Sequence, residues 1–341
     1  MTEIVTFPQV LNALCANQEL SELQLRWIFF EMMAGRCPDA VAAGFLIALK
    51  MKGESAHEIA CAARALREHM IAWNPERANV LDTCGTGGDG SGTFNISTAT
   101  ALVVASVGVP VVKHGNRSVS SKTGSADVLT ALGVRIDGDA GFARRCLRET
   151  NFAFCFAPNF HPALKHISNV RRALGVPTIF NCLGPLANPA GAPRQLIGVG
   201  RRDLLDRMAG ALAELGTSRA FLICAQDGLD EVSLNSPTLV REVKSGRVVT
   251  HEWSPNDFGL EACTIAELSA EDAEASARII QDVLKGEAGP ARRIVLANAA
   301  AALLVADRVT TLRDGVKLAA EAIDSGTAAN TLERLRGLAR E

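Results

Sequence analysis

Apolar residues recur at helical spacing through the first 73 residues. Ser21-Glu22-Leu23-Gln24 has the form of a capping box, and the apolar positions that follow it are Leu25, Ile28, Phe29, Met32 and Met33. A second helix is predicted from Pro38 to Lys52, and a third follows a capping box at Ser55–Glu58 and continues to Met70. The pattern therefore predicts a small helical domain, residues 1–73, whose apolar faces pack on one another or on a partner subunit.

From Val80 onward, short apolar runs alternate with helical segments, a pattern typical of a mainly parallel sheet covered by helices. Strands are expected near 80–82, 109–112, 134–136, 152–156, 195–199 and 220–224. Helices are expected at 97–107, 125–132, 139–149, 204–215, 271–285, 290–306, 311–324 and 328–338. Residues 238–243 and 247–252, joined by Lys244-Ser245-Gly246, predict a β-hairpin. The predicted fold class is thus α/β, with the helical domain followed by a larger α/β domain, residues 77–341.

Composition narrows the possible functions. The 341 residues are 48% hydrophobic, enough for a packed core, and a net charge of −2 is not that of a general nucleic-acid binder. The nine cysteines show neither C-x-x-C nor zinc spacing, which fits reduced thiols in a cytoplasmic protein. The N-terminus lacks a basic start followed by an apolar run, and no run of about 18 apolar residues occurs, so neither a signal peptide nor a membrane span is expected.

Two loops rich in Gly, Ser and Thr carry the most specific chemistry. Residues 82–98 read DTCGTGGDGSGTFNIST, and residues 113–129 read KHGNRSVSSKTGSADVL. Each follows an apolar run that can be a buried strand, and such loops let backbone N–H groups and hydroxyls surround an anion at the start of a helix. Lys113 and Arg117 add positive charge that suits phosphate. The two loops together predict a site for phosphate and diphosphate groups, although neither matches the usual nucleotide-binding signatures.

Two later segments add candidate ligands. A helix is predicted after Pro162, ending near Gly175, and it carries Arg171. His161 at its start is interpreted as a structural histidine. Further on, the adjacent carboxylates Asp230 and Glu231 follow the predicted strand 220–224. Carboxylates of this kind can hold Mg²⁺, and open α/β sheets bind ligands at the carboxyl ends of their strands.

The two loops resemble the paired signature of the anthranilate phosphoribosyltransferases, Gly-Thr-Gly-Gly-Asp and Lys-His-Gly-Asn-Arg, and both match completely at Gly85–Asp89 and Lys113–Arg117. The resemblance extends over almost the whole chain. It implies transfer of 5-phosphoribose from 5-phosphoribosyl 1-diphosphate to the amino group of anthranilate, an early step of tryptophan biosynthesis. It also implies a cytoplasmic homodimer joined through its helical domains, with residues of about 160–188 returning to the helical domain, and no nucleic-acid or membrane partner.

The resemblance also implies a set of binding residues. Those expected for the phosphoribosyl donor are Gly85, Gly88, Asp89, Thr93, Asn95, Ile96, Ser97, Thr98, Lys113, His114, Gly115, Asn116, Arg117, Ser118, Val119, Ser120, Ser121 and Ser125. Gly85, Asn116 and Arg171 are expected to bind anthranilate, and Ser97, Asp230 and Glu231 are expected to hold Mg²⁺, as two ions. No catalytic residue is assigned, because the aromatic amine is already neutral at pH 7 and rate can come mainly from positioning.

Two alternatives remain at this point. A pyrimidine nucleoside phosphorylase carries a similar Lys-His-Gly loop, but Asn116, Asp89 and the pair Asp230-Glu231 argue against it. A non-catalytic relative that binds nucleic acid would need a basic surface and decayed substrate motifs. The net charge of −2 and the intact loops oppose that interpretation.

Overall fold

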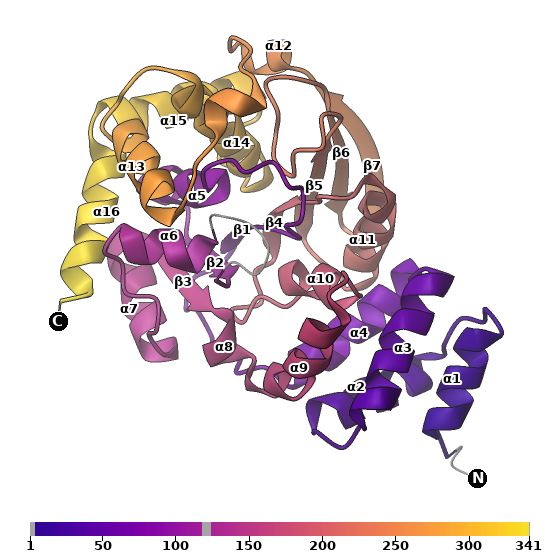
Figure 1. Cartoon of the computed structure of the whole chain (residues 1–341). Coiled ribbons are helices and arrows are strands. Elements are labelled where there is room, and N and C mark those ends of the chain that lie inside the picture. Colours follow the sequence, from indigo (N-terminus) through magenta and orange to yellow (C-terminus); the bar gives the residue numbers. More distant parts are fainter. Residues whose placement is uncertain (1–3, 118–123, 341) are drawn as a thin grey trace.

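The chain begins with a helical bundle that stands apart from the sheet (Figure 1). The computed structural model describes residues 4–117 and 124–340. The bundle comprises α1 (Phe7–Cys15), α2 (Glu22–Met33), α3 (Asp39–Lys52) and α4 (Ala56–Glu68). The capping boxes predicted at Ser21 and Ser55 are both formed. Helix α1, which has Pro8 in its first turn, was not among the individually predicted helices.

The rest of the chain is organised on one seven-stranded sheet with the order β3-β2-β1-β4-β5-β6-β7. Its strands are β1 (Leu81–Gly85), β2 (Val111–Gly115), β3 (Phe152–Phe156), β4 (Arg194–Gly198), β5 (Arg219–Ala225), β6 (Thr238–Lys244) and β7 (Arg247–Trp253). Strands β1 to β5 pair in parallel, and β6 and β7 add the predicted antiparallel hairpin at one edge. The predicted fold class is confirmed.

The long helices lie within about two residues of their predicted ranges. They are α5 (Ile96–Ser106), α6 (Ser125–Ala131), α7 (Ala140–Thr150), α9 (Lys165–Leu174), α11 (Arg202–Glu214), α13 (Ala273–Leu284), α14 (Pro290–Val305), α15 (Leu312–Asp324) and α16 (Thr327–Leu338). Single-turn helices α8 (Ala157–Phe160), α10 (Phe180–Leu183) and α12 (Pro255–Phe258) complete the α-helices of the described residues.

The strand predicted at 134–136 is wrong. Val134 and Ile136 are buried while Arg135 between them is exposed, so the alternation that suggested a strand is real. The segment nevertheless pairs with no described strand, because it only connects α6 to α7. Its first N–H closes the end of α6 by donating to the Leu129 carbonyl. The alternation of apolar and polar residues at 134–136 therefore reflects which side chains are buried, and not the pairing of a strand.

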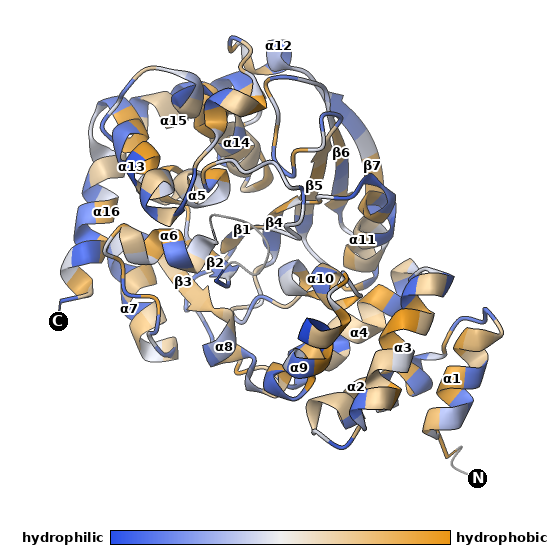
Figure 2. Cartoon of the chain, viewed as in Figure 1, coloured by the Kyte–Doolittle hydropathy of each residue, from blue (hydrophilic) through white to orange (hydrophobic). Residues whose placement is uncertain are grey.

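Alternating side chains of the sheet enter two separate cores. Along β5, Phe221 and Ile223 belong to the core built with α5 and α13 to α16, whereas Leu222 and Cys224 belong to the core built with α11 and the helical bundle. The buried residues of α5 and α14 belong to the first of these cores, and Figure 2 marks the hydrophobic positions on the ribbon. Because both faces of the sheet are covered, ligands can reach its strands only at their ends.

Residues beyond β3 return to the helical bundle. Ile167 and Val170 of α9 and Phe180 of α10 lie in the same core as α2, α3 and α4. Phe180 contacts Phe29 with ring centroids 5.7 Å apart, and Lys50 Nζ donates to the Pro177 carbonyl at 2.6 Å. Figure 1 shows α9 beside α2. This segment therefore joins the helical bundle to the carboxyl ends of the strands.

Nothing in the described part of the chain is both long and apolar enough, as a helix, to cross a membrane. All nine cysteines are free thiols, and seven of them are buried.

Candidate active site

The first glycine loop leaves the carboxyl end of β1 and is supported by the end of β4. The Thr86 N–H donates to the Gly198 carbonyl at 2.9 Å, and the Gly200 N–H donates to Thr86 Oγ1 at 3.0 Å. A Cβ at Gly198 would lie 1.8 Å from the Asp230 carbonyl oxygen, and a Cβ at Gly200 would lie 2.7 Å from the Gly87 carbonyl oxygen. These two glycines were not predicted as part of the site. Their signal was a Gly-x-Gly at the end of the predicted strand 195–199.

Three carboxylates meet beside this loop. Asp230 lies near the Asp89 side chain and the Gly87 backbone, and Glu231 lies near the Ser97 backbone. Burial and the negative charge of Asp89 raise the pKa of Asp230 to about 7. Burial and Asp230 raise the pKa of Glu231 well above its usual value, although Lys113 opposes this. Neighbouring acidic groups whose pKa values are raised in this way favour a bound cation, since oxygen ligands of this kind suit Mg²⁺.

Lys113, the first residue of the second predicted loop, contacts two residues of the first loop. Its side chain is buried, with 2% exposed, and Nζ donates to the Thr83 carbonyl and, at 3.0 Å, to Ser97 Oγ. Burial lowers the pKa of Lys113, while Asp82 and the acidic cluster oppose that change. The ammonium group is thus bonded to protein acceptors beside the carboxylates. A direct contact with a phosphate oxygen remains a prediction.

The start of α5 is capped from within the protein. Asn95 Oδ1 accepts from the Thr98 N–H at 3.1 Å and from Ser97 Oγ at 3.3 Å, and the Ile96 N–H donates to the Phe94 carbonyl. The side chains of Ile96 and Thr98 are buried. Thr93 and Phe94 are held against residues 268–269. The predicted phosphate contacts of Asn95 to Thr98 would require these internal bonds to be exchanged, and they remain predictions.

The second loop folds back onto the start of α6. A Cβ at Gly115 would lie 2.2 Å from Ser125 Oγ, and the Asn116 carbonyl accepts from the Ala126 N–H at 3.3 Å. Arg117 forms an ion pair with Asp127 at 2.7 Å. The predicted donor ligands Ser118, Val119, Ser120 and Ser121 lie outside the described residues.

Two buried histidines face each other next to this loop. The His114 and His161 ring centroids are 4.9 Å apart, and His114 Nδ1 lies 3.2 Å from the Gly184 carbonyl oxygen. Burial, together with His161, lowers the pKa of His114 to about 3, and burial lowers the pKa of His161 to about 4. Both rings are therefore neutral near pH 7. His114 Nδ1 then carries the proton donated to Gly184, which leaves Nε2 as an acceptor without a partner among the described residues.

Asp82, in strand β1, bonds to the backbone of His114 in the neighbouring strand β2. It is fully buried, accepts from the His114 N–H at 3.2 Å and from Asn188 Nδ2 at 2.7 Å, and was not predicted as part of the site. Asn188 Nδ2 also donates to the Val112 carbonyl at 2.8 Å. The sequence of a strand does not show whether an acidic side chain in it will be buried and accept hydrogen bonds.

Arg171 lies on the far side of the site, on α9. Its guanidinium carbon is 5.2 Å from the centroid of the Phe180 ring, and the guanidinium forms no ion pair or hydrogen bond with another described residue. Burial lowers the pKa of Arg171, as expected for a half-buried cation without a carboxylate partner. No bond links Arg171 to Gly85 or Asn116 within residues 4–117 and 124–340. A cavity of about 60 Å³ adjoins the glycine loop. It is lined by residues that include Lys50 of α3, Asn181, and Arg201, the residue that precedes α11.

Comparison with known proteins decides the family. A glycosyl transferase family helical bundle domain matches residues 8–70, and a glycosyl transferase family α/β domain matches residues 77–329. The chain is 48% identical to the anthranilate phosphoribosyltransferase of Symbiobacterium thermophilum over 96% of both chains. The chain belongs to the anthranilate phosphoribosyltransferase family.

Solved structures of the anthranilate phosphoribosyltransferase family share the fold described above. The Thermus thermophilus enzyme superimposes with a TM-score of 0.91 at 39% identity, covering 97% of this chain and 99% of that one. The Saccharomyces cerevisiae enzyme in complex with PRPP and Mg superimposes with a TM-score of 0.90 at 28% identity, covering 98% of both chains. Membership of the anthranilate phosphoribosyltransferase family supports the main interpretation of the sequence and neither the nucleoside phosphorylase nor the nucleic-acid-binding alternative.

The paired histidines make a stability prediction. His161 has a pKa of about 4 in the folded chain and about 6.5 when unfolded, so the unfolded state binds the proton first as pH falls. The free energy of unfolding should therefore be fully retained above pH 6.5 and should decline from there toward pH 4, by at most roughly 1.4 kcal/mol per pH unit from this group. We expect His161→Gln to remove this part of the decline.

Urea unfolding of the wild type and the variant between pH 7 and pH 5 measures the difference. His166→Gln, at an exposed position of α9, is the matched control and should leave the pH dependence unchanged. A variant that follows the wild-type pH dependence would show that His161 is not buried as a neutral ring.

Proposed function

We propose that this chain transfers the 5-phosphoribosyl group of 5-phosphoribosyl 1-diphosphate to the amino group of anthranilate. In this reaction the bond from the anomeric carbon to diphosphate breaks, a bond from that carbon to the amine nitrogen forms, and the amine loses one proton. The products are N-(5-phosphoribosyl)anthranilate and diphosphate, as in tryptophan biosynthesis. The observation that carries the proposal is the combination of two features. A glycine loop and acidic cluster lie on the sheet, and Arg171, which has no ion pair among the described residues, lies on the segment that packs with the helical bundle.

At the donor end, the chain supplies a loop and a charge arrangement suited to diphosphate. Gly87, Gly88, Gly90 and Gly92 all adopt positive φ, which lets backbone groups approach a ligand closely. Asp230, Glu231 and Ser97 would hold Mg²⁺, and we propose that two ions bind. The crowding that raises the pKa of both carboxyl groups fits this assignment. When bound, Mg²⁺ would neutralise negative charge on the leaving diphosphate.

At the acceptor end, the chain would mainly orient the substrate. Arg171 can pair with the anthranilate carboxylate through two parallel hydrogen bonds, while Asn116 and the Gly85 backbone border the same substrate. The aromatic amine is neutral at pH 7 and needs no strong base. Positioning it against the anomeric carbon, with water excluded, supplies the rate. His114 and His161 offer neutral rings next to the second loop, and we add both to the candidates for contact with the acceptor.

We also propose a cytoplasmic homodimer joined through the helical bundles. Leu23, Phe30 and Met51 of these helices are 49%, 46% and 80% exposed, which leaves apolar surface for a second copy to cover. Nine free thiols are compatible with a reducing compartment.

The test is the fluorescence of anthranilate mixed with the protein, 5-phosphoribosyl 1-diphosphate and Mg²⁺. Loss of anthranilate fluorescence only when all components are present is the expected result. The control replaces both substrates with thymidine or uridine and inorganic phosphate without Mg²⁺. Phosphorolysis there, with unchanged anthranilate fluorescence, would favour a nucleoside phosphorylase instead.

Closure of the two parts over the substrates is a further prediction. The predicted acceptor ligand Arg171 packs with the helical bundle, whereas the donor loops belong to the sheet, so a complete site requires the two parts to approach each other. We expect the radius of gyration from solution scattering to fall when both substrate sites are filled with Mg²⁺ present, using an unreactive anthranilate analogue. Identical dimensions with and without ligands would contradict closure.

A further inference from the structure

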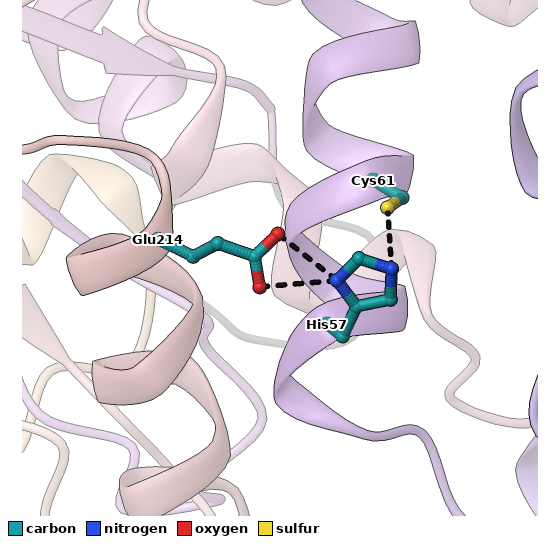
Figure 3. A group of neighbouring side chains, drawn as sticks. All are labelled: His57, Cys61 and Glu214. Atoms are coloured by element: carbon teal, nitrogen blue, oxygen red, sulfur yellow. Dashed lines mark hydrogen bonds and ion pairs between the residues drawn. The ribbon is translucent and has the colours of Figure 1, made fainter. Parts of the chain in front are cut away.

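A group of three potential metal ligands lies where α4 meets α11, and the proposed reaction uses none of them. His57 and Cys61 are four residues apart on α4 and therefore share one face, and Glu214 is the last residue of α11 (Figure 3). One ligand atom from each lies within 4.8 Å of the other two. The carboxylate of Glu214 lies 3.0 and 3.2 Å from His57 Nδ1, and Cys61 Sγ lies 3.5 Å from His57 Nε2.

The distance of 3.5 Å between His57 Nε2 and Cys61 Sγ is close to the separation of two ligands of one metal ion. Zinc binds histidine nitrogen at about 2.0–2.1 Å and thiolate sulfur at about 2.3 Å with tetrahedral angles, which separates two such ligands by roughly 3.5 Å. At the other ring nitrogen, Nδ1, Glu214 is the kind of hydrogen-bond partner that metal-binding histidines usually have. A carboxylate that accepts the Nδ1 proton fixes the ring orientation and leaves Nε2 unprotonated toward the sulfur.

We propose that His57 and Cys61 form a binding site for a thiophilic divalent cation of the Zn²⁺ type, with Glu214 holding the imidazole ring from its other nitrogen. The ion forms one bond to Nε2 and one to Sγ, the Cys61 thiol releases its proton to solvent, and water fills the remaining positions. Binding of the ion and loss of the thiol proton occur together.

The burial of Cys61 favours binding of a small ion over attack of its thiol on a substrate. The side chain of His57 is 45% exposed, whereas Cys61 is only 3% exposed. The exposed part of the imidazole ring is the side from which an ion can approach. Burial also raises the pKa of the Cys61 thiol. The carboxylate–histidine–thiol arrangement is therefore a metal site and not a nucleophile.

Arg64 limits the affinity of this site. Its Nη1 donates to Glu214 Oε1 at 3.0 Å and lies 3.7 Å from Cys61 Sγ, so it places a positive charge beside the ion. Arg64→Ala should tighten binding by several-fold, because it removes that charge while His57, Cys61 and Glu214 remain. A role of the cluster in packing alone would not predict this gain.

Titration of the whole chain with Co²⁺, followed by competition with Zn²⁺, tests the proposal. We expect a thiolate-to-cobalt absorption band in the near ultraviolet, saturating at one ion per chain and lost when Zn²⁺ is added. Cys61→Ser should abolish the band, His57→Gln should weaken cobalt binding at least tenfold, and Arg64→Ala should strengthen it. Co²⁺ on the carboxylates of the candidate active site gives no thiolate band, so the two sites are distinguished even if the proposed reaction is wrong.

Cys15→Ser and Cys37→Ser are the matched controls, because Cys15 is exposed and Cys37 partly exposed. Both should retain the band. Failure to observe it in the wild type, its survival in Cys61→Ser, or its loss in either control would overturn the proposal. The His57 side chain is 45% exposed, so His57→Gln provides a folded test even if Cys61→Ser is unstable.

Discussion

Replacing Asp230 with Asn and Glu231 with Gln together is expected to abolish most activity while the protein remains folded. The two carboxylates lie beside Asp89. Burial and the charge of Asp89 raise the pKa of Asp230, and burial and the charge of Asp230 raise the pKa of Glu231. If they hold the cation that neutralises diphosphate, their loss removes several kcal/mol of transition-state stabilisation, or roughly a hundred- to ten-thousandfold in kcat/KM. Steady-state rates across a range of Mg²⁺ concentrations measure the effect.

The stability of the same double variant separates a metal site from a structural role. Removing two crowded negative charges relieves repulsion, so the Tm without Mg²⁺ should be unchanged or higher. Glu271→Gln with Glu287→Gln, at exposed positions, is the charge-matched control and should keep full activity. Activity near that of the wild type at limiting Mg²⁺ would exclude these carboxylates as ligands, and unfolding of the variant would make them structural.

The fold was predictable because its signals are local. Capping boxes at Ser21 and Ser55 begin helices, and apolar runs of strand length alternate with amphipathic segments from Val80 onward. The strand expected at 134–136 failed for a reason that no local pattern contains. Val134 and Ile136 alternate with an exposed Arg135 as in a strand, yet only the path of the neighbouring strands decides whether a segment finds a pairing partner.

The residues of the candidate site that belong to a sequence motif could be predicted. Those that reach the site only through tertiary packing could not. The sequence placed Asp230 and Glu231 at a strand end, and the structure brings them to the glycine loop and to Ser97. It did not indicate that Gly198 and Gly200 must lack a Cβ for that loop to approach, since that requirement arises from a neighbouring strand. Nor did it indicate that His161, 47 residues after His114, would lie against that ring.

Substitution of Arg171 by Ala is expected to raise the KM for anthranilate about ten- to a hundredfold and to change the KM for 5-phosphoribosyl 1-diphosphate far less. Arg171 is half-buried, contacts Phe180, and has no carboxylate partner among the described residues. Burying a cation without a partner is unfavourable, so a site that keeps one is suited to an anionic ligand. Anthranilate brings a planar carboxylate that fits the guanidinium fork.

The expected size of the Arg171 effect follows from the two hydrogen bonds that would be lost. Hydrogen bonds to charged groups contribute roughly 1.5–3 kcal/mol, and a tenfold change in KM corresponds to about 1.4 kcal/mol.

Arg171→Lys should not restore binding, because an ammonium group cannot make the planar two-point contact. Arg172→Ala is the matched control, since its side chain is the next one along α9 and is exposed. Steady-state kinetics with each substrate varied in turn distinguish the outcomes. If Arg171→Ala raised the donor KM and left the anthranilate KM unchanged, the acceptor would have to bind elsewhere, and the cavity beside Lys50 and Asn181 would be the next place to test.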